Sequence, residues 1–332
     1  MSAAPNAARV ATDDAALRRT VERLLARADG RPAEVRALTR TPSPFTTLFP
    51  VEVLSLSLRD GRELSLFVKH LGSRRVDHPE KRRRDRELLI YEELLGDDEL
   101  PVARYYGSEW SEDGERRELF LEYIPDWDLR YHELEHWFTA ARRLARLHAH
   151  FAARERHLLS RDYLLRLDAE YLREWAERAL GVVAGYDAAL AHRLSPVAGA
   201  YARIAGAQAR RPVTLVHNDL SPKNVLADRA YAPARIGIVD WEVAGVGCGV
   251  LDLVDLTYGL DPASDERMRD AYCAELAGTG LLPTDRGELD ALFAACELQK
   301  TIHRLAHGAS WGLPLDTVAR WTREAEQLLT EV

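Results

Sequence analysis

The sequence predicts an α+β protein with a small β-rich N-terminal lobe and a larger, mainly helical C-terminal lobe. The chain has 332 residues, which is long enough for two hydrophobic cores. Alternating apolar runs joined by Asp-Gly turns fill the first third, whereas most of the remainder has apolar residues at helical spacing. We therefore expect an N-terminal lobe over residues 1–124 and a C-terminal lobe over residues 125–332.

The N-terminal lobe is expected to contain two helices and two hairpins. Residues 13–28 place apolar side chains at helical spacing and are followed by Gly30, a common helix stop. Asp60-Gly61 and Asp113-Gly114 are strong hairpin turns between alternating segments. The expected strands are 51–58, 64–69, 105–110 and 118–123, and a charged second helix is expected over 81–95.

After Ile124 the pattern becomes helical. One apolar stripe begins at Trp137, and helix-like sequence continues to Ala209. Short strands are expected at 213–216 and 235–239, and helices return over 264–332. The β-structure is thus concentrated in the first third of the chain.

Charge and cysteine usage exclude several classes of protein. A net charge of -8 and a pI near 5.8 argue against a dedicated nucleic-acid binder. The three cysteines form no CxxC pair, which argues against a disulfide framework or a zinc site. No run approaches the roughly 18 apolar residues of a membrane span, and the N-terminus lacks an apolar signal core. We expect a cytoplasmic protein with no nucleic-acid and no membrane partner.

The most informative segment runs from His217 to Asn224, and the strand-like run after it ends at Asp240. Phosphoryl transfer needs a carboxylate that orients and deprotonates an attacking hydroxyl, and oxygen ligands that hold Mg²⁺ on the phosphates. Asp219 suits the first role, and Asn224 with Asp240 suits the second. A plain turn would explain an Asp and an Asn, but not their spacing together with Asp240.

Lys69 and Glu87 form a second candidate pair. Lys69 ends an expected strand, and Glu87 lies on the helix expected after it. In kinases a strand lysine holds the nucleotide phosphates and a helix glutamate fixes that lysine. The alternative is a surface lysine at a strand end and an unrelated helix-face glutamate, with Arg86 and Glu92 as competing neighbours.

These motifs resemble the aminoglycoside phosphotransferase and choline kinase family of the protein-kinase-like superfamily. The resemblance extends in element order from about Leu48 to Leu260. Its sharp motifs are His217-Asn218-Asp219, Pro222 with Asn224, and Ile238-Val239-Asp240-Trp241-Glu242. It implies a bilobal protein-kinase-like fold, ATP and Mg²⁺ as cofactors, and transfer of the γ-phosphate to a hydroxyl group.

The resemblance also implies individual roles. Lys69 with Glu87 would hold the phosphates, and Asp219 would be the catalytic base. Glu122-Tyr123-Ile124 would be the link between the lobes, where backbone groups bind adenine. Further contacts to the magnesium nucleotide are expected from Ser221, Asn224 and Asp240.

The sequence departs from the protein-kinase pattern in three places. No GxGxxG loop covers the phosphates, and the stretch 41–47, with Ser43 and Thr46, is expected to supply backbone N–H groups and hydroxyls instead. Ser221 replaces a lysine, and Asn218 replaces the arginine that reads activation-loop phosphorylation, so this control is not expected. Asp252 matches a family residue that braces the catalytic loop.

Contacts with the phosphate acceptor are assigned by position alone. Beside Asp219, the candidates are Trp241, Glu242, Lys300 and His303. The simpler interpretation is that they are core or surface residues. His303 and His307 also have the i, i+4 spacing of metal ligands, but the sequence shows no third ligand.

We therefore expect a kinase whose acceptor is a hydroxyl of a small molecule, such as an aminoglycoside, a sugar, an amino alcohol or a related metabolite. Two alternatives remain open. The same chemistry could act on Ser or Thr of a peptide in ribosomal-peptide modification, or the protein could sense nucleotides without transferring phosphate. The presence of Lys69, Asp219, Asn224 and Asp240 argues against the second alternative.

Overall fold

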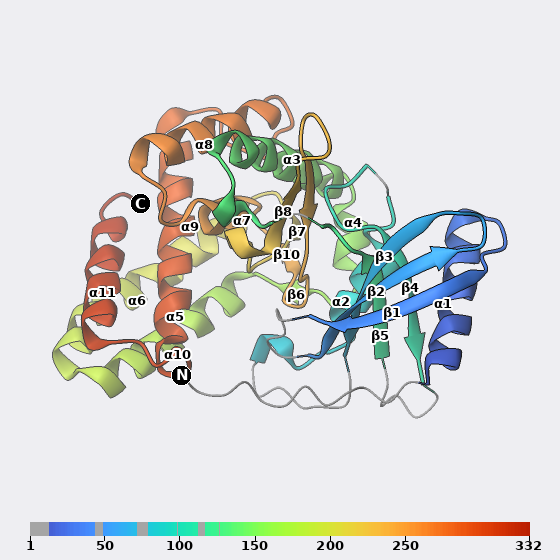
Figure 1. The fold of residues 1–332 in the computed structure, drawn as a ribbon. Helices are drawn as coiled ribbons and strands as arrows, with labels where there is room; N and C mark the ends of the chain where they lie inside the picture. The colour runs from blue at the N-terminus through green and yellow to red at the C-terminus, as the bar shows by residue number, and fades with distance from the viewer. Residues whose placement is uncertain (1–12, 44–48, 72–78, 98, 112–116, 126) are drawn as a thin grey trace. The chain divides into compact units, whose positions relative to one another are not determined.

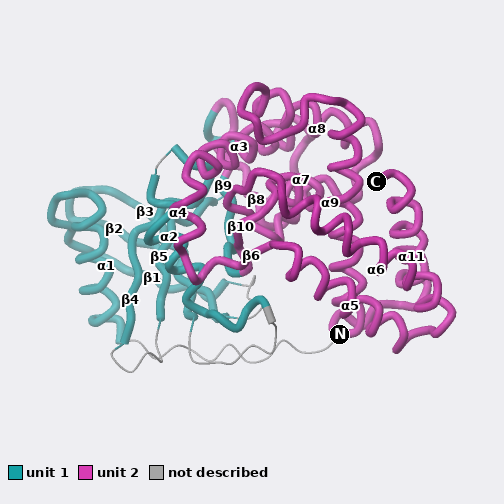
Figure 2. The backbone as a smooth tube through the Cα atoms, turned by 180° about the vertical axis from the view of Figure 1, so that it is seen from behind, with its two compact units in different colours: residues 1–126, 228–231, 237–242 teal, residues 127–227, 232–236, 243–332 magenta. Residues whose placement is uncertain are grey.

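The computed structural model describes residues 13–43, 49–71, 79–97, 99–111, 117–125 and 127–332. The chain folds into two compact units (Figure 2). Unit 1 comprises residues 1–126, 228–231 and 237–242, and unit 2 comprises residues 127–227, 232–236 and 243–332. The β-rich N-terminal sheet and the helical C-terminal part confirm the predicted α+β class.

Unit 1 is built on an antiparallel five-stranded sheet of order β1-β2-β3-β5-β4 (Figure 1). Its strands are β1 (Val35–Pro42), β2 (Val51–Leu58), β3 (Glu63–His70), β4 (Tyr105–Trp110) and β5 (Arg117–Glu122). The hairpin at Asp60-Gly61 joins β2 to β3 as predicted, and Gly61 has the positive φ of 87° that favours glycine there. The strand β1 was not predicted.

Helix α1 (Asp14–Asp29) packs against this sheet (Figure 1). Its apolar stripe, with Leu24 at the centre, shares a buried cluster with Leu56 and Val68 of the sheet. Gly107 of β4 lies so close that an added Cβ would come 2.4 Å from Leu24 Cδ2, so only glycine allows this approach. Because successive strand residues face opposite sides, Val68 faces α1 and Lys69 faces the other side of the sheet.

Helix α2 (Arg86–Glu93) follows the short 3₁₀ turn η1 (Pro79–Lys81). The prediction of a helix over 81–95 is therefore wrong at both ends. Residues 82–85 precede the helix as irregular and turn structure, and the helix ends at Glu93. Only the central part of the expected range, residues 86–93, is helical. This shift brings Glu87 into the first turn of α2.

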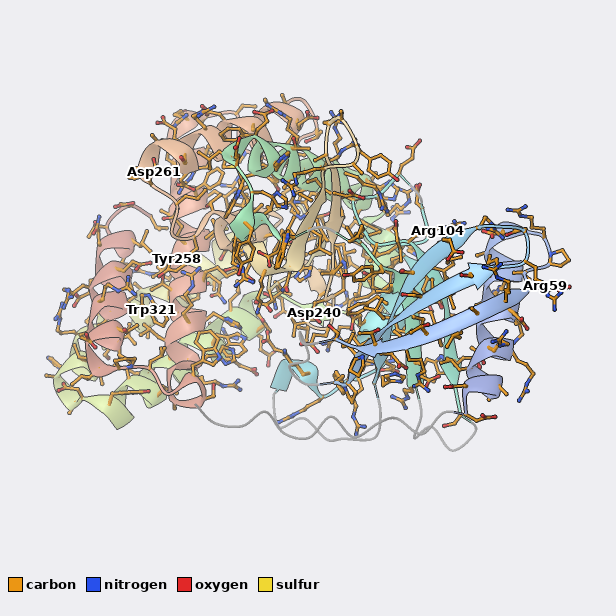
Figure 3. The ribbon with its side chains drawn as sticks, in the orientation of Figure 1. Arg59, Arg104, Asp240, Tyr258, Asp261 and Trp321 are labelled. Atoms are coloured by element: carbon orange, nitrogen blue, oxygen red, sulfur yellow. The ribbon has the colours of Figure 1, made fainter. Side chains whose placement is uncertain are left out.

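Unit 2 consists mainly of helices. They are α3 (Leu134–Ala152), α4 (Glu155–Leu159), α5 (Ala169–Tyr186), α6 (Ala188–Gln208), α7 (Val250–Thr257), α8 (Pro262–Glu275), α9 (Arg286–Ala306), α10 (Gly308–Trp311) and α11 (Leu315–Leu329), with the 3₁₀ turns η2 (Leu129–Tyr131) and η3 (Pro222–Asn224). A single core joins α5, α6, α9 and α11. Trp321 of α11 donates from Nε1 to the Tyr258 hydroxyl at 2.8 Å, next to the end of α7 (Figure 3).

Short strands complete the fold. Strands β6 (Leu165–Arg166), β10 (Gly245–Gly247) and β7 (Thr214–Val216) form a three-stranded sheet in that order, and β8 (Val225–Asp228) pairs with β9 (Arg235–Ile238). Strands β7 and β9 were predicted, whereas β6, β8 and β10 were not. In the described residues, no helix has the length and apolar character needed to cross a bilayer.

Candidate active site

Unit 1 brings Lys69 to two carboxylates that are distant in sequence. Lys69 Nζ lies 2.6 Å from Glu87 Oε2 and 2.6 Å from Asp240 Oδ1. Lys69 is supplied by β3, Glu87 by α2, and Asp240 by the segment after β9 (Asp240 is labelled in Figure 3). The lysine side chain is 10% exposed and that of Asp240 is 30% exposed, so the aspartate has an accessible side.

The charges of this cluster depend on one another. Burial lowers the pKa of Lys69, but Asp240, Glu87 and Glu242 outweigh it and hold this pKa well above its usual value. Burial raises the pKa of Glu87 to about 7, with the Lys69 charge opposing the shift and Asp240 adding to it. One buried ammonium thus remains charged and is shared by two carboxylates.

The segment that carries Asp240 is fastened to α2. Arg86 is buried and donates from Nη1 to the backbone oxygen of Glu242 at 2.7 Å, and the Lys81 ammonium bonds the Glu242 carboxylate. Asp240 itself has a φ of 71°, which is uncommon for a residue other than glycine and is typical of functional loops. The sequence pattern did not reveal Arg86 and Lys81, although the dense basic run 81–86 was the available signal.

Trp241 does not fit its predicted contact with the acceptor. Its indole is fully buried, and Nε1 donates to the Ile238 backbone oxygen at 3.2 Å. The ring offers no surface to a ligand, so this residue is part of the core. Glu242 is also mostly covered, with a side chain 13% exposed and paired with Lys81.

In unit 2, Asp252 braces the loop that carries Asp219. Its carboxylate accepts from the backbone nitrogens of His217 at 2.7 Å and Asn218 at 2.9 Å, which confirms the predicted brace. Burial would raise the pKa of Asp252, but the hydrogen bond and charge of His148, with smaller contributions from His217 and Lys300, hold it below its usual value. The carboxylate therefore stays ionised and accepts both N–H groups.

Asp219, Asn224 and Ser221 lie on this same loop. Asn224 is buried and donates from Nδ2 to the Asp219 backbone oxygen at 2.8 Å, which fixes the orientation of its amide. The Asp219 side chain is 44% exposed and lies 3.8 Å from the Lys223 ammonium. Ser221 Oγ is buried and has no hydrogen-bond partner among the described residues, as is expected of a polar group that awaits a ligand.

The remaining nucleotide-binding predictions fall on unit 1. Glu122 ends β5, Tyr123 is 38% exposed and donates from its backbone nitrogen to Ser65 O at 3.1 Å, and Ile124 is buried. Ser43 continues the ladder after β1 through a 2.9 Å backbone bond to Val51 O. Thr46 lies outside the described residues.

Two further acceptor candidates lie on α9. Lys300 is 3% exposed, pairs with Asp255 at 2.6 Å and donates to Asn218 O at 2.9 Å. It faces the loop interior, so the predicted contact with the acceptor is wrong for this residue. His303 is partly buried, and its ring lies 4.2 Å from that of Trp175 and 4.6 Å from that of His307.

The predicted residues therefore come together in two groups. Unit 1 assembles Lys69, Glu87 and Asp240, and unit 2 assembles Asp219 and Asn224 on a braced loop. Oxygen ligands of the carboxylate and amide type suit Mg²⁺, and the shielded ammonium of Lys69 suits a phosphate. The donor chemistry of both groups thus fits a magnesium nucleotide.

Comparison with known proteins identifies the family. The model of the phosphotransferase enzyme family matches residues 56–292, which is most of the chain and includes both groups of residues. The chain belongs to this family. As a phosphotransferase family member it is a kinase-type enzyme, which bears out the resemblance seen in the motifs. A search of curated protein sequences finds no significant match.

Solved structures share the fold at low sequence identity. A microcompartment-associated aminopropanol kinase has 17% identity and a TM-score of 0.58, with 88% of this chain and 90% of that chain covered. The GDP complex of an aminoglycoside phosphotransferase variant has 14% identity and a TM-score of 0.58, with 95% and 97% covered. A choline kinase from Streptococcus pneumoniae has 15% identity and a TM-score of 0.50, with 95% and 98% covered.

Proposed function

We propose that this phosphotransferase uses ATP and Mg²⁺ to phosphorylate a hydroxyl group of a small molecule. The observation that carries the proposal is the pairing of Lys69 with both Glu87 and Asp240. A structural ion pair would need only one carboxylate. Glu87 is the buried partner of the ammonium, whereas the second carboxylate, Asp240, is partly exposed and can also bind a cation. A magnesium nucleotide supplies both a cation for Asp240 and an anion for Lys69.

The residues of unit 1 would bind the phosphates and the metal. Lys69, held by Glu87, would neutralise phosphate charge, and Asp240 would offer a carboxylate oxygen to Mg²⁺.

The residues of unit 2 would act on the acceptor. Asp219 would orient the attacking hydroxyl and take up its proton as the bond to phosphorus forms. Asn224 would give Mg²⁺ a neutral amide oxygen, and the Ser221 hydroxyl, which has no partner in the part of the chain that the structure describes, would donate to a phosphate oxygen. The bound metal would neutralise the charge that develops on the transferred group, so the protein itself contributes mainly positioning.

The acceptor class is proposed on family grounds together with the accessibility of Asp219. Related folds belong to kinases named for an amino alcohol, an aminoglycoside and choline, which are all small hydroxyl compounds that also carry an amine or a quaternary ammonium group. The half-exposed carboxylate of Asp219 can reach such a compound from solvent. We therefore propose a small hydroxylated amine as the first class to test.

A screen of hydroxyl compounds tests this function. Purified protein is incubated with ATP, MgCl₂ and a library of amino alcohols, amino sugars and neutral sugars, and products are analysed by mass spectrometry. We expect a gain of one phosphate on a member of the amine-bearing set, and no gain when EDTA removes the metal. Absence of phosphorylation across the library, with ATP shown to bind, would contradict a small-molecule hydroxyl as the acceptor.

A further inference from the structure

Asn218, the residue before Asp219, is held in an unusual backbone conformation. Its φ is 69°, in the left-handed region that residues other than glycine rarely adopt. Such a conformation persists only when surrounding contacts fix it. The backbone conformation of Asn218 sets the direction of the chain at Asp219 and therefore the position of the Asp219 carboxylate.

Every polar group of Asn218 has a partner within unit 2. The backbone nitrogen donates to Asp252 Oδ1 at 2.9 Å, and the side-chain Nδ2 donates to the Tyr171 hydroxyl at 3.0 Å. The backbone oxygen accepts from Lys300 Nζ at 2.9 Å, and Lys300 also lies 3.4 Å from Asn218 Oδ1. The lysine therefore bonds the carbonyl group that would be displaced if the Asn218 backbone left the left-handed conformation.

Lys300 is itself fixed by its surroundings. It comes from the buried face of α9, is 3% exposed, and pairs with Asp255 Oδ2 of α7 at 2.6 Å. Arg304, one turn later on α9, lies 3.3 Å from the other oxygen of Asp255. A buried ammonium is expensive to desolvate, and an apolar side chain would usually stabilise such a place equally well. Its placement on the Asn218 carbonyl therefore points to a role in the geometry of the loop.

We propose that Lys300 is a positioning residue: through the carbonyl of Asn218 it fixes the backbone that presents Asp219. This inference rests on the proposed function, in which Asp219 is the base. Lys300 touches neither substrate nor nucleotide in this role. Lys300 of α9 bonds the peptide that follows Asn218, and Asp252 bonds the peptide that precedes it, so a charged group holds each of the two peptides.

The test compares Lys300→Met and Lys300→Arg with a matched control. Lys300→Met removes the ammonium but leaves Asp255 paired with Arg304, so the fold should survive. The control, Arg269→Met, breaks the ion pair between Arg269 of α8 and Glu297 of α9, the helix that carries Lys300, but it does not touch the loop of residues 217–224. Lys300→Arg keeps a donor for both Asn218 O and Asp255.

Two measurements are made on each full-length variant. Hydrogen exchange of peptides covering residues 217–224 reports the loop directly, and hydrolysis of Mg·ATP with water as acceptor gives kcat and KM. We expect Lys300→Met to speed loop exchange at least about tenfold. We expect its kcat to fall about 100-fold because the base is misplaced, with KM for ATP within about threefold of the wild type. Lys300→Arg should recover most of both losses, and Arg269→Met should change neither.

The inference is overturned if the loop of Lys300→Met exchanges hydrogen at the wild-type rate. It is also overturned if Arg269→Met, with a melting temperature lowered as much as that of Lys300→Met, shows the same faster exchange and lower kcat. The exchange measurement decides this without any acceptor. Asp219→Asn separates the two proposals. If Asp219→Asn retains the wild-type kcat, the proposed function fails; if it abolishes turnover while Lys300→Met does not, only the role of Lys300 fails.

Discussion

Lys69 is the residue whose surroundings are hardest to explain by folding alone. It lies in unit 1 between Glu87 and Asp240, both at 2.6 Å, and its own side chain is 10% exposed. Two carboxylates around one ammonium leave an excess negative charge in a poorly solvated place, which a proton on Glu87 or a bound cation would relieve. The cluster therefore has the electrostatic character of a binding site.

Replacing Lys69 by Met should weaken nucleotide binding. The ammonium would be lost to the phosphates, and hydrogen bonds to charged groups are worth about 1.5–3 kcal/mol, so ATP should bind about 10- to 100-fold more weakly. Calorimetric titration with Mg·ATP measures this. Glu87→Gln keeps the ammonium and should weaken ATP binding less. Arg23→Met removes an exposed ion pair with Glu109 and should leave ATP binding unchanged. Equal affinities for the Lys69→Met variant and the wild type would contradict the assignment.

At the scale of elements, helix α7 supports the loop that carries Asp219 through one side chain. Asp252 in its first turn is fully buried and accepts from two consecutive backbone N–H groups, while His148 of α3 approaches its Oδ2 at 3.3 Å. Gly249 just before α7 lets His148 come close, because an added Cβ would lie 2.6 Å from His148 Nδ1. The loop is thus fixed by helices that are far from it in sequence.

Asp252→Asn should destabilise unit 2. The amide has one acceptor oxygen, so one backbone N–H would face an N–H of the new side chain and lose its partner. Leaving a buried donor unsatisfied costs about 1–3 kcal/mol. Urea unfolding followed by circular dichroism measures the loss. Asp261→Asn is the control, because Asp261 caps α8 (labelled in Figure 3) and Asn caps a helix equally well. If both variants lost a similarly small amount of stability, the hydrogen bonds of Asp252 to the loop would not contribute the stability that we assign to them.

The sheet of unit 1 carries a polar row across four strands. Arg40, Glu52, His70 and Glu118 lie on β1, β2, β3 and β5, and His70 is 2.9 Å from Glu52 and 3.2 Å from Glu118. Burial opposes the charged imidazole, but the hydrogen bonds and charges of Glu118 and Glu52 outweigh it and raise the pKa of His70. Burial likewise opposes ionisation of Glu52, yet His70 and Arg40 lower its pKa to about 2.

This row predicts how the stability of unit 1 varies with pH. The contribution of His70 is present below its unfolded pKa of about 6.5 and is lost as the pH rises through the higher folded value. The contribution of Glu52, at most about 3 kcal/mol, is present above its unfolded pKa and is lost as the pH falls toward 2. The row therefore stabilises unit 1 most between about pH 4.5 and about pH 6.5.

Replacing His70 by Gln should flatten the pH dependence on the alkaline side. The wild type should lose stability between about pH 6 and about pH 8, and His70→Gln should lose less over the same range while being less stable at the lower pH. Urea titrations at both pH values measure this. His157→Gln, at an exposed position of α4, should keep the wild-type slope. An unchanged slope in His70→Gln would show that the row does not set the pH response.

The sequence was informative where chemistry is local. Helix α1, the first hairpin and the placement of Asp219 and Asn224 on one loop followed from short patterns, and the brace by Asp252 was implied by the family resemblance. The contacts of Arg86, Lys81 and Lys300 did not, because each joins residues that are far apart in the chain and only the tertiary fold pairs them. Trp241 was predicted to contact the acceptor because it follows the candidate metal ligand Asp240, but its ring is fully buried in the core.

At the scale of the whole molecule, the candidate site residues are divided between two compact units. Unit 1 recruits the short segment 237–242 from late in the sequence, and this segment delivers Asp240 to Lys69. Unit 2 keeps the loop of Asp219 and Asn224. The family match spans both units, so the proposed chemistry depends on residues of each.

The most direct measurement of the central claim is phosphate transfer by the wild type and by Asp219→Asn, followed by mass spectrometry of the acceptor found in the library screen. The substitution keeps the size of the side chain and removes the base from a half-exposed position, so the fold and Mg·ATP affinity should be unchanged. We expect the rate of phosphorylation to fall at least about 100-fold. Transfer at the wild-type rate by Asp219→Asn would contradict the account.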